Sequence, residues 1–327
     1  MQYTIQNLLV LWLLSGLMSA VYGEDVLLRR FLTEAPVGWS HIRKTIETNV
    51  SVDTPSGKVI ESGKDEVTPP LQIRLMGNYE LFSSLQQGKA PQYLEAINKE
   101  YAFSLGRDVS DSPFLLENIL YDTQKYRTKH QWRHNHLQGC ILPFEGIMME
   151  GAWLEDVFVS PDITIAQIKE IKVDNHPAVE VVFSGNYQVD KYNVFGNGTV
   201  VFLPEKNWTL LSYTGENSDA RTKTGVVRSI NTKTIEYQTF DSIPFPKLIK
   251  TSYQRKDGSQ SAYIQELGVP GKVKNSDIFY LKHYGFGELE IKPASNFTIR
   301  TILMLAGVIL IILGLTLYLL SPKKKKQ

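Results

Sequence analysis

The sequence predicts an α+β fold dominated by antiparallel β-sheet, followed by one C-terminal transmembrane helix. Three observations support this prediction. The C-terminal half alternates short β-branched and aromatic runs with turn residues. The first part mixes helical and strand patterns. Residues 301–320 contain no charged side chain, which is typical of a membrane-spanning helix.

The N-terminus has the pattern of a secretory signal peptide. Residues 8–17 form an apolar run that is too short to cross a bilayer comfortably and is followed by small residues. Val21 and Gly23 supply the small residues needed three and one positions before a cleavage point. We therefore expect residues 1–23 to be removed as a signal peptide. No Lys or Arg precedes the apolar run, so an uncleaved signal anchor is the alternative.

The C-terminus predicts a single membrane crossing. At about 1.5 Å per residue, twenty helical residues just span a hydrocarbon core of about 30 Å, and we assign residues 300–320 to this helix. Four lysines follow, in the tail 321–327, so the tail is expected in the cytoplasm and the large domain outside it. A bacterial sorting signal is one alternative, although no sorting motif precedes the segment. In a eukaryote, Lys324 and Lys325 would also match a dilysine retrieval signal.

Composition limits what the extracytoplasmic domain, residues 24–299, can be. Its length suits one large β-rich domain or two smaller ones, with a possible boundary near 105–115. It holds 30 basic and 34 acidic residues, which argues against a nucleic-acid partner because phosphate binding needs a concentrated basic surface. The single Cys140 permits no internal disulfide. Four Asn-x-Ser/Thr sites would be glycan acceptors in a eukaryotic secretory protein: Asn49, Asn197, Asn207 and Asn296.

The C-terminal half predicts consecutive antiparallel hairpins. Short turn clusters separate its apolar runs, for example around Gly196–Gly198 and Asp257–Gly258. Ile249, Thr251 and Tyr253 alternate with polar residues, which indicates one buried and one solvated face. We expect at least five consecutive antiparallel strands within 179–267, at 179–183, 199–203, 209–213, 226–230, 234–240, 248–254 and 261–267.

The first part of the domain predicts a mixture of helices and strands. Residues 26–33 are expected to form a short helix, and 40–52 a helix-to-strand or long-strand segment. Residues 71–84 are expected to form a strand with Gly77 as a bulge, and 101–105 another strand. Ser112 and Pro113 have the pattern of a helix start. Apolar side chains then fall on one face of that expected helix: Leu116, Ile119, Leu120, Thr123 and Tyr126.

Several segments of the sequence resemble those of a known group of proteins. They are Asn98 to Phe103, the strand-turn-strand from Thr199 to Trp208, Phe245-Pro246-Lys247 before a strand, and the closing Phe279 to Phe286. Together they resemble exported bacterial proteins of unknown function whose sheets are similar to the half-barrel of periplasmic lipoprotein carriers of the LolA/LolB type. The resemblance covers about 26–286 and implies a curved antiparallel sheet wrapped over helices, but no chemistry. A tethered chain cannot diffuse as a shuttle does, which argues against shuttling and leaves binding of an acyl chain or a lipidated partner as a role compatible with the resemblance.

Two classes of function follow from these observations. The first is a membrane-tethered binding or envelope-organising module, in which a concave sheet face holds an apolar ligand or a protein segment. The side chains expected to line that face are Phe183, Tyr187, Tyr237 and Tyr253. No motif for a cofactor or for catalysis supports an enzyme.

The second class is a metal-dependent enzyme that uses a histidine-rich segment. His130, His134, His136 and Cys140 lie within eleven residues of one another, and two of the histidines have the i, i+4 spacing that lets two imidazoles reach one metal on a helix. No Glu stands between them as a general base, and basic residues are interleaved with them. Positive potential disfavours a divalent cation, so we expect these histidines to diverge and to bind no metal.

Overall fold

The computed structural model describes residues 26–287, except for 56, 62–63, 68–69, 86–90, 108–111, 124–141, 189–192 and 220–226. The expected signal peptide and the expected transmembrane segment lie outside these residues. Among the helices that are described, none combines the length and the apolar character needed to cross a bilayer. The chain divides into two compact units, Met1–Tyr284 and Gly285–Gln327, and the elements below belong to the first.

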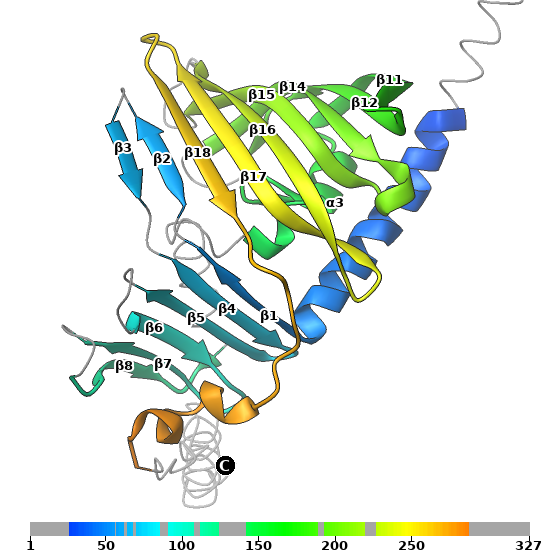
Figure 1. Cartoon of the computed structure of the whole chain (residues 1–327). Helices are drawn as coiled ribbons and strands as arrows, with labels where there is room; N and C mark the ends of the chain where they lie inside the picture. The colour runs from blue at the N-terminus through cyan, green and yellow to red at the C-terminus, as the bar shows by residue number, and fades with distance from the viewer. Residues whose placement is uncertain are drawn as a thin grey trace, which may run out of the picture. The chain divides into compact units, whose positions relative to one another are not determined.

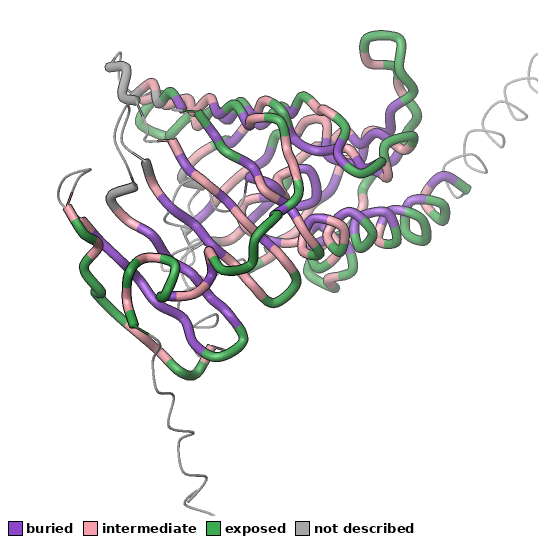
Figure 2. The backbone as a smooth tube through the Cα atoms, turned by 60° about the horizontal axis from the view of Figure 1, so that its bottom comes forward, coloured by how far each residue is buried: buried purple, intermediate pink, exposed green. Residues whose placement is uncertain are grey.

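The first element is one continuous helix over residues 26–48. Residues 26–33 are helical as expected, but the helix is not short, because it continues to residue 48. For residues 40–52 the helix-to-strand alternative is confirmed and the long-strand alternative is wrong. Apolar residues recur every three to four positions on both sides of Pro36, and their side chains are buried. The buried positions of the helix alternate with exposed ones along its length (Figure 2). The apolar residues are Leu27, Phe31, Ala35, Trp39, Ile42 and Ile46. The strand β1 (Val50–Thr54) begins only after the helix ends.

A six-stranded antiparallel sheet follows, in the order β1-β4-β5-β6-β7-β8. Its strands after β1 are β4 (Leu71–Met76), β5 (Tyr79–Leu85), β6 (Pro91–Ile97), β7 (Ala102–Gly106) and β8 (Leu115–Leu120). The strand expected at 101–105 is β7, which confirms that prediction.

Two expectations for this sheet were wrong. Residues 71–84 form a hairpin rather than one bulged strand, because Gly77 has φ +62° and supplies the positive angle that a tight hairpin turn requires. The segment after Pro113 is the edge strand β8 rather than a helix. Its backbone pairs with β7 through Leu105 and Leu116, so pairing with an existing sheet overrides the helical pattern of its apolar residues. Of the expected face, Tyr126 lies outside the described residues.

The second sheet has ten strands (Figure 1). Its order is β11-β12-β14-β15-β16-β17-β18-β2-β3, with β13 paired to β14. The strands are β11 (Ile163–Val173), β12 (His176–Gly185), β13 (Tyr187–Gln188), β14 (Asn193–Leu203), β15 (Thr209–Asp219), β16 (Val227–Phe240), β17 (Ile243–Arg255), β18 (Gln260–Glu266), β2 (Lys58–Glu61) and β3 (Lys64–Val67).

The prediction of at least five consecutive antiparallel strands is confirmed, since β12, β14, β15, β16, β17 and β18 pair in that order. Two details differ. The expected strands 226–230 and 234–240 are one long strand, β16. The glycine cluster Gly196–Gly198 marks a register shift inside β14 instead of a turn, because glycine is also compatible with a bulge.

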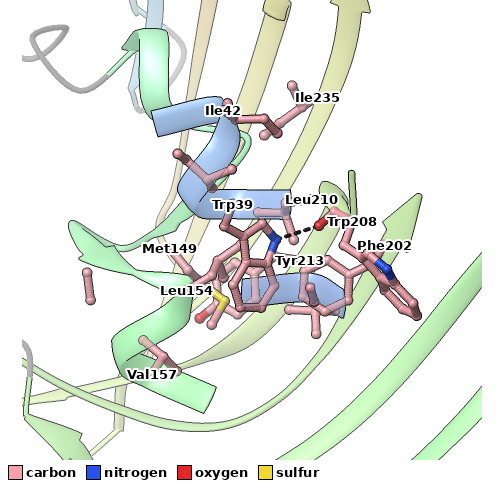
Figure 3. Close-up of a cluster of buried hydrophobic side chains, with 14 of the residues drawn as sticks. Trp39, Ile42, Met149, Leu154, Val157, Phe202, Trp208, Leu210, Tyr213 and Ile235 are labelled. Carbon is pink, nitrogen blue, oxygen red and sulfur yellow. Dashed lines mark hydrogen bonds between the residues drawn. The ribbon is translucent and has the colours of Figure 1, made fainter. Parts of the chain in front are cut away.

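One hydrophobic core joins the N-terminal helix to both sheets. Its buried residues include Phe31 and Trp39 of the helix, Ile73 of β4 and Ile249 of β17. Figure 3 shows the centre of this core, where the indole Nε1 of Trp39 donates a hydrogen bond to the carbonyl oxygen of Trp208 at 2.7 Å. The short helix α3 (Leu154–Val159) contributes Leu154 and Val157 to the same cluster.

The segment 267–275, which we call the strap, connects β18 to the six-stranded sheet along β1. Gly271 pairs with Ser51, and the side chain of Asn49 binds both backbone groups of Val273. Beyond the strap, the 3-10 helices η3 (Ser276–Phe279) and η4 (Leu281–Tyr284) pack aromatic rings on the sheet, with Phe279 against Tyr79. The face of the six-stranded sheet opposite the core is covered there by η3 and η4.

Candidate functional site

The inner face of the ten-stranded sheet changes chemistry across its width. Towards β12 and β14 it is apolar, and Phe183 and Phe202 pack against Phe158 of α3 with ring centroids 5.8 Å apart in each pair. Towards β16 and β17 it carries polar side chains, among them Asn231 and Lys233, at positions that are almost fully buried. Burying a polar group costs free energy unless the group is hydrogen-bonded or paired, so these side chains are expected to have partners.

The four aromatic residues expected to line a concave face are all on this sheet, but they do not gather in one place. Phe183 is 1% exposed and belongs to the packed core. Tyr187 is half-buried at the edge of the same cluster. The hydroxyl of Tyr237 donates to the carbonyl oxygen of Leu210 at 2.5 Å. Only Tyr253 lies among the buried polar residues, so a ligand site made of all four residues stays a prediction.

The polar half is organised around Lys233. Its ammonium group contacts the Glu145 carboxylate at 2.5 Å, and the two side chains are only 7% and 14% exposed. Burial lowers the pKa of Lys233, but Glu145 and Glu150 more than offset this and hold it above the ordinary value. Lys233 is therefore a cation at neutral pH. Glu145 is presented by the turn that follows the 3-10 helix η1 (Leu142–Phe144).

Glu150 approaches the same region from a hairpin. It lies with Gly151 in the two-residue turn between β9 (Met148–Met149) and β10 (Ala152–Trp153). Its φ of 52° is a left-handed conformation that side chains other than Asn and Gly adopt with strain. Burial raises the pKa of Glu150. Lys233 and the Asn231 amide act in the opposite direction, and Glu145 adds to the rise.

Tyr213 and Asn231 form the floor of the region, and each is 1% exposed. The Tyr213 side chain lies along its own strand, over Gly215. A Cβ atom at position 215 would be 2.5 Å from the Tyr213 hydroxyl, so any residue larger than glycine would clash there. Gly215 pairs across the sheet with Asn231, which brings the hydroxyl towards the Asn231 amide. Burial raises the pKa of Tyr213 well above its ordinary value, and the nearby Glu150 adds to this.

These residues make up what we call the polar cluster: Glu145, Glu150, Tyr213, Asn231, Lys233 and Tyr253. Five buried side-chain atoms in the described part of the chain have no hydrogen bond of good geometry: Glu150 Oε1, Thr209 Oγ1, Tyr213 OH, Asn217 Oδ1 and Asn231 Nδ2. Native proteins rarely leave buried polar atoms unpaired. The Asn231 amide lies close enough to Glu150 to lower its pKa through a hydrogen bond, so a small side-chain movement pairs two of these atoms with each other.

Sequence reasoning missed most of this cluster. Glu145 and Glu150 were visible as acidic residues, but nothing in their spacing connected them to Lys233, which is 83 or more residues away along the chain. One signal was available. Ile235 lies on the buried face of β16, and counting back by two along a strand places Lys233 and Asn231 on that same face. A lysine at a buried strand position requires a partner.

A second feature lies on the six-stranded sheet. It is a small apolar hollow, in which the space open to a water-sized sphere is about 10 Å³. Ile73 and Phe82, which are paired across β4 and β5, line it and belong to the common core. The other lining residues are Leu71, Gln72, Ser83, Ser84 and Tyr93. The paired residues Leu71, Ser84 and Tyr93 share a face with Ile73 and Phe82.

The histidine-rich segment is outside the described residues, and this includes His130, His134, His136 and Cys140. No group of three or more metal-ligating side chains occurs among the residues that are described. The hypothesis of a metal-dependent enzyme therefore stays a prediction without structural support.

Comparison with known proteins finds similarity only among solved structures. No family model and no curated protein matches the chain. A LolA superfamily protein from Nitrosomonas europaea is 10% identical, with a TM-score of 0.40 over 77% of this chain and 99% of that one. A DUF1329 family protein from Desulfovibrio piger has 9% identity and the same TM-score and coverage. A putative outer membrane lipoprotein-sorting protein domain from Vibrio parahaemolyticus has 9% identity and a TM-score of 0.32, over 76% of this chain and 97% of that one. Structures similar to this chain thus include LolA superfamily members, the group that its sequence resembles.

Proposed function

We propose that this chain is a membrane-tethered extracytoplasmic binding protein that holds a lipid, or the acyl chain of a lipidated partner, against the inner faces of its sheets. It acts by binding, not by catalysis. The observation that carries the proposal is the apolar hollow on β4, β5 and β6, where Ile73 and Phe82 continue the hydrophobic core to an open side.

The size and lining of the hollow suit part of an acyl chain. The space in the hollow that is open to a water-sized sphere is about 10 Å³, room for about one water molecule, so the hollow would hold only one end of an apolar ligand whose remainder lies outside it. Each methylene group removed from water contributes about 0.8 kcal/mol. A single methyl or methylene group against Leu71, Ile73 and Phe82 would therefore contribute about 0.8 kcal/mol, and the rest of an acyl chain would have to bind along the neighbouring surface.

The tether supplies the location for this function. An uncharged stretch at 301–320 followed by four lysines would fix the domain at the outer surface of a membrane. Lipids and lipidated proteins are concentrated at such a surface. A binding domain held there meets its ligand without diffusing through the surrounding compartment.

A photocrosslinking experiment tests this proposal. A benzophenone amino acid replaces Ser84, which is half-buried and lines the hollow, in the full-length chain expressed in its membrane. Irradiation should produce a lipid or lipoprotein adduct that mass spectrometry identifies. The matched control carries the same amino acid at Ser252, which is exposed on β17. Equal adducts at both positions, or none at Ser84, would contradict the proposal.

A further inference from the structure

The outer edges of the two sheets differ in how they are protected. The ten-stranded sheet ends in β11 and β3, and the six-stranded sheet ends in β1 and β8. Native proteins protect or cover a sheet edge, because its unpaired backbone groups can pair with another chain. β11 carries the exposed Lys169 and Lys172, β3 has the sequence Lys-Asp-Glu-Val, and the strap pairs with β1 through Gly271.

The edge strand β8 presents apolar side chains instead. Four of its six residues are aliphatic, and it contains no lysine or arginine. Leu115 is 63% exposed and Leu116 is 38% exposed. Among the residues that the structure describes, β8 pairs only with β7, at the end of the sheet (Figure 1). Another strand can extend a sheet at an apolar edge of this kind.

The sequence of β8 is complementary to itself in the antiparallel direction. It reads Leu-Leu-Glu-Asn-Ile-Leu, which is two apolar residues, two polar residues and two apolar residues. A second copy, related by a two-fold axis between Glu117 and Asn118, would place apolar residues opposite apolar ones and polar residues opposite polar ones. The pairs are Leu115 with the partner's Leu120, Leu116 with the partner's Ile119, and Glu117 with the partner's Asn118.

A bulge in β8 allows this pairing to match on both faces of the sheet. Directly opposite residues of an antiparallel pair point to the same face, and side chains alternate along a regular strand. Leu115 and Leu120 are five positions apart, so in a regular strand they would point to opposite faces. Glu117 is an extra residue in the pairing with β7, and the two leucines therefore lie opposite Gly106 and Ala102, which are four positions apart. Both leucines thus point to one face.

The inner pairs match in the same way. Leu116 and Ile119 lie opposite residues of β7 that are two positions apart, so they share the other face. Asn118 lies opposite the residue two positions before Gly106, and a Cβ atom at Gly106 would touch the Glu117 carboxylate, so Glu117 and Asn118 also share a face. The amide of one copy can donate to the carboxylate of the other, and no like charges are opposite one another.

The place where the chain leaves the domain agrees with this arrangement. Antiparallel pairing of a strand with its own copy has a two-fold axis perpendicular to the sheet, so each face of one copy continues into the same face of the other. The 3-10 helices η3 and η4 pack on one face, through Phe279 on Tyr79 and Tyr284 on Phe103. The chain continues past Tyr284 from that face in both copies. Both expected membrane-spanning segments could therefore enter one bilayer.

We infer that β8 pairs with β8 of a second copy of this chain, so that the two six-stranded sheets join into one continuous sheet in a two-fold symmetric dimer. The pairing removes the exposed leucines of β8 from water. The inference goes beyond lipid binding and rests on the proposed function only for the tether, which holds both copies in one membrane and raises their local concentration.

Cysteine crosslinking in the native membrane tests the pairing and its register. Two differently tagged full-length chains, both carrying Cys140→Ser, are co-expressed, one with Leu115→Cys and the other with Leu120→Cys. Directly opposite residues have Cα atoms about 4.5–5.5 Å apart, within the range of a disulfide, so mild oxidation should give a crosslinked heterodimer. Leu115→Cys should not crosslink with itself, because four strand steps would separate the two copies of this residue by about 13 Å. The control pair, Lys169→Cys with Lys172→Cys on β11, should give no crosslink.

A charge substitution gives an independent measurement. The wild type should be a dimer in mild detergent by size-exclusion chromatography with light scattering. Leu116→Lys places a cation opposite the partner's apolar Ile119 on each side of the axis, so this variant should be a monomer with an unchanged circular dichroism spectrum. The matched control is Val269→Lys, which changes a more exposed apolar residue of the strap and should remain a dimer.

The outcomes separate this inference from the proposed function. Self-crosslinking of Leu115→Cys as strong as that of the mixed pair would show unspecific contact between exposed leucines and would overturn the inference. A monomeric wild type without the mixed crosslink would overturn it too, as would loss of the dimer in Val269→Lys. A dimer that carries no lipid would contradict the proposed function alone, whereas lipid bound to a monomeric wild-type chain would contradict this inference alone.

Discussion

Replacing Lys233 with methionine should destabilise the protein strongly, because it leaves two buried carboxylates without their cation. The gross attraction between Lys233 and Glu145 at 2.5 Å is about 7 kcal/mol at an effective dielectric constant of 20. Desolvation cancels much of this in the intact pair. Removing one partner leaves the other buried and unpaired, which typically costs about 3–5 kcal/mol. For a chain of this size, that loss corresponds to a fall in Tm of roughly 10 °C.

The assay is thermal unfolding of the full-length chain in detergent, followed by tryptophan fluorescence. The double variant Lys233→Met, Glu145→Gln should recover most of the loss, because Glu150 can be protonated when no cation remains nearby. The deficit of the single variant should also shrink from pH 8 to pH 5, as Glu150, whose pKa burial already raises, takes up a proton. A single variant within about 2 °C of wild type, or a double variant that is no better than the single one, would refute the reasoning.

Four further predictions follow, three from the structure and the last from the sequence. Burial raises the pKa of Glu150, so this residue lowers the stability of the fold as the pH rises above the pKa of a glutamate in the unfolded chain. Glu150→Gln should therefore raise Tm at pH 7.5 and change it little at pH 4. An equal shift of Tm at both pH values would contradict this. Trp39→Phe loses the bond to Trp208 and part of a buried ring, and should cost about 2–4 kcal/mol in denaturant unfolding; a cost below about 1 kcal/mol would show that the helix is held elsewhere. Asn49→Ala removes both contacts with Val273 and should make the strap more sensitive to limited proteolysis, with unchanged cleavage as the opposing result. External protease added to sealed spheroplasts should digest the large domain and leave a small C-terminal fragment; a protected domain would refute the topology.

The sheet was predictable from sequence where pairing is local. Strands β16, β17 and β18 are joined by short turns, and alternation in β17 correctly placed Ile249 and Thr251 on the buried face and Lys250 outside. The pattern failed where long-range packing decides the structure. The helix at 26–33 was expected to be short, but residues on both sides of Pro36 belong to one helix and bury against a sheet formed more than 100 residues later.

The candidate site was less predictable because it is assembled from distant segments. Glu145 and Glu150 approach from short elements between the sheets, while Lys233 and Asn231 belong to β16. Their proximity depends on how η1 and the β9–β10 hairpin lie on the sheet, which no local pattern encodes. The expected aromatic face was drawn from composition alone. The structure shows that Phe183 is already used by the core.

Lipid binding in the hollow of the six-stranded sheet is the claim on which the account depends most. Native mass spectrometry of the full-length chain released from its own membrane tests it directly. The wild type should carry a bound lipid of defined mass. Ser84→Trp, which fills the hollow, should lose it, and Ser252→Trp on the exposed face of β17 should keep it. A bound lipid that survives Ser84→Trp, or a wild-type chain that carries none, would contradict the account.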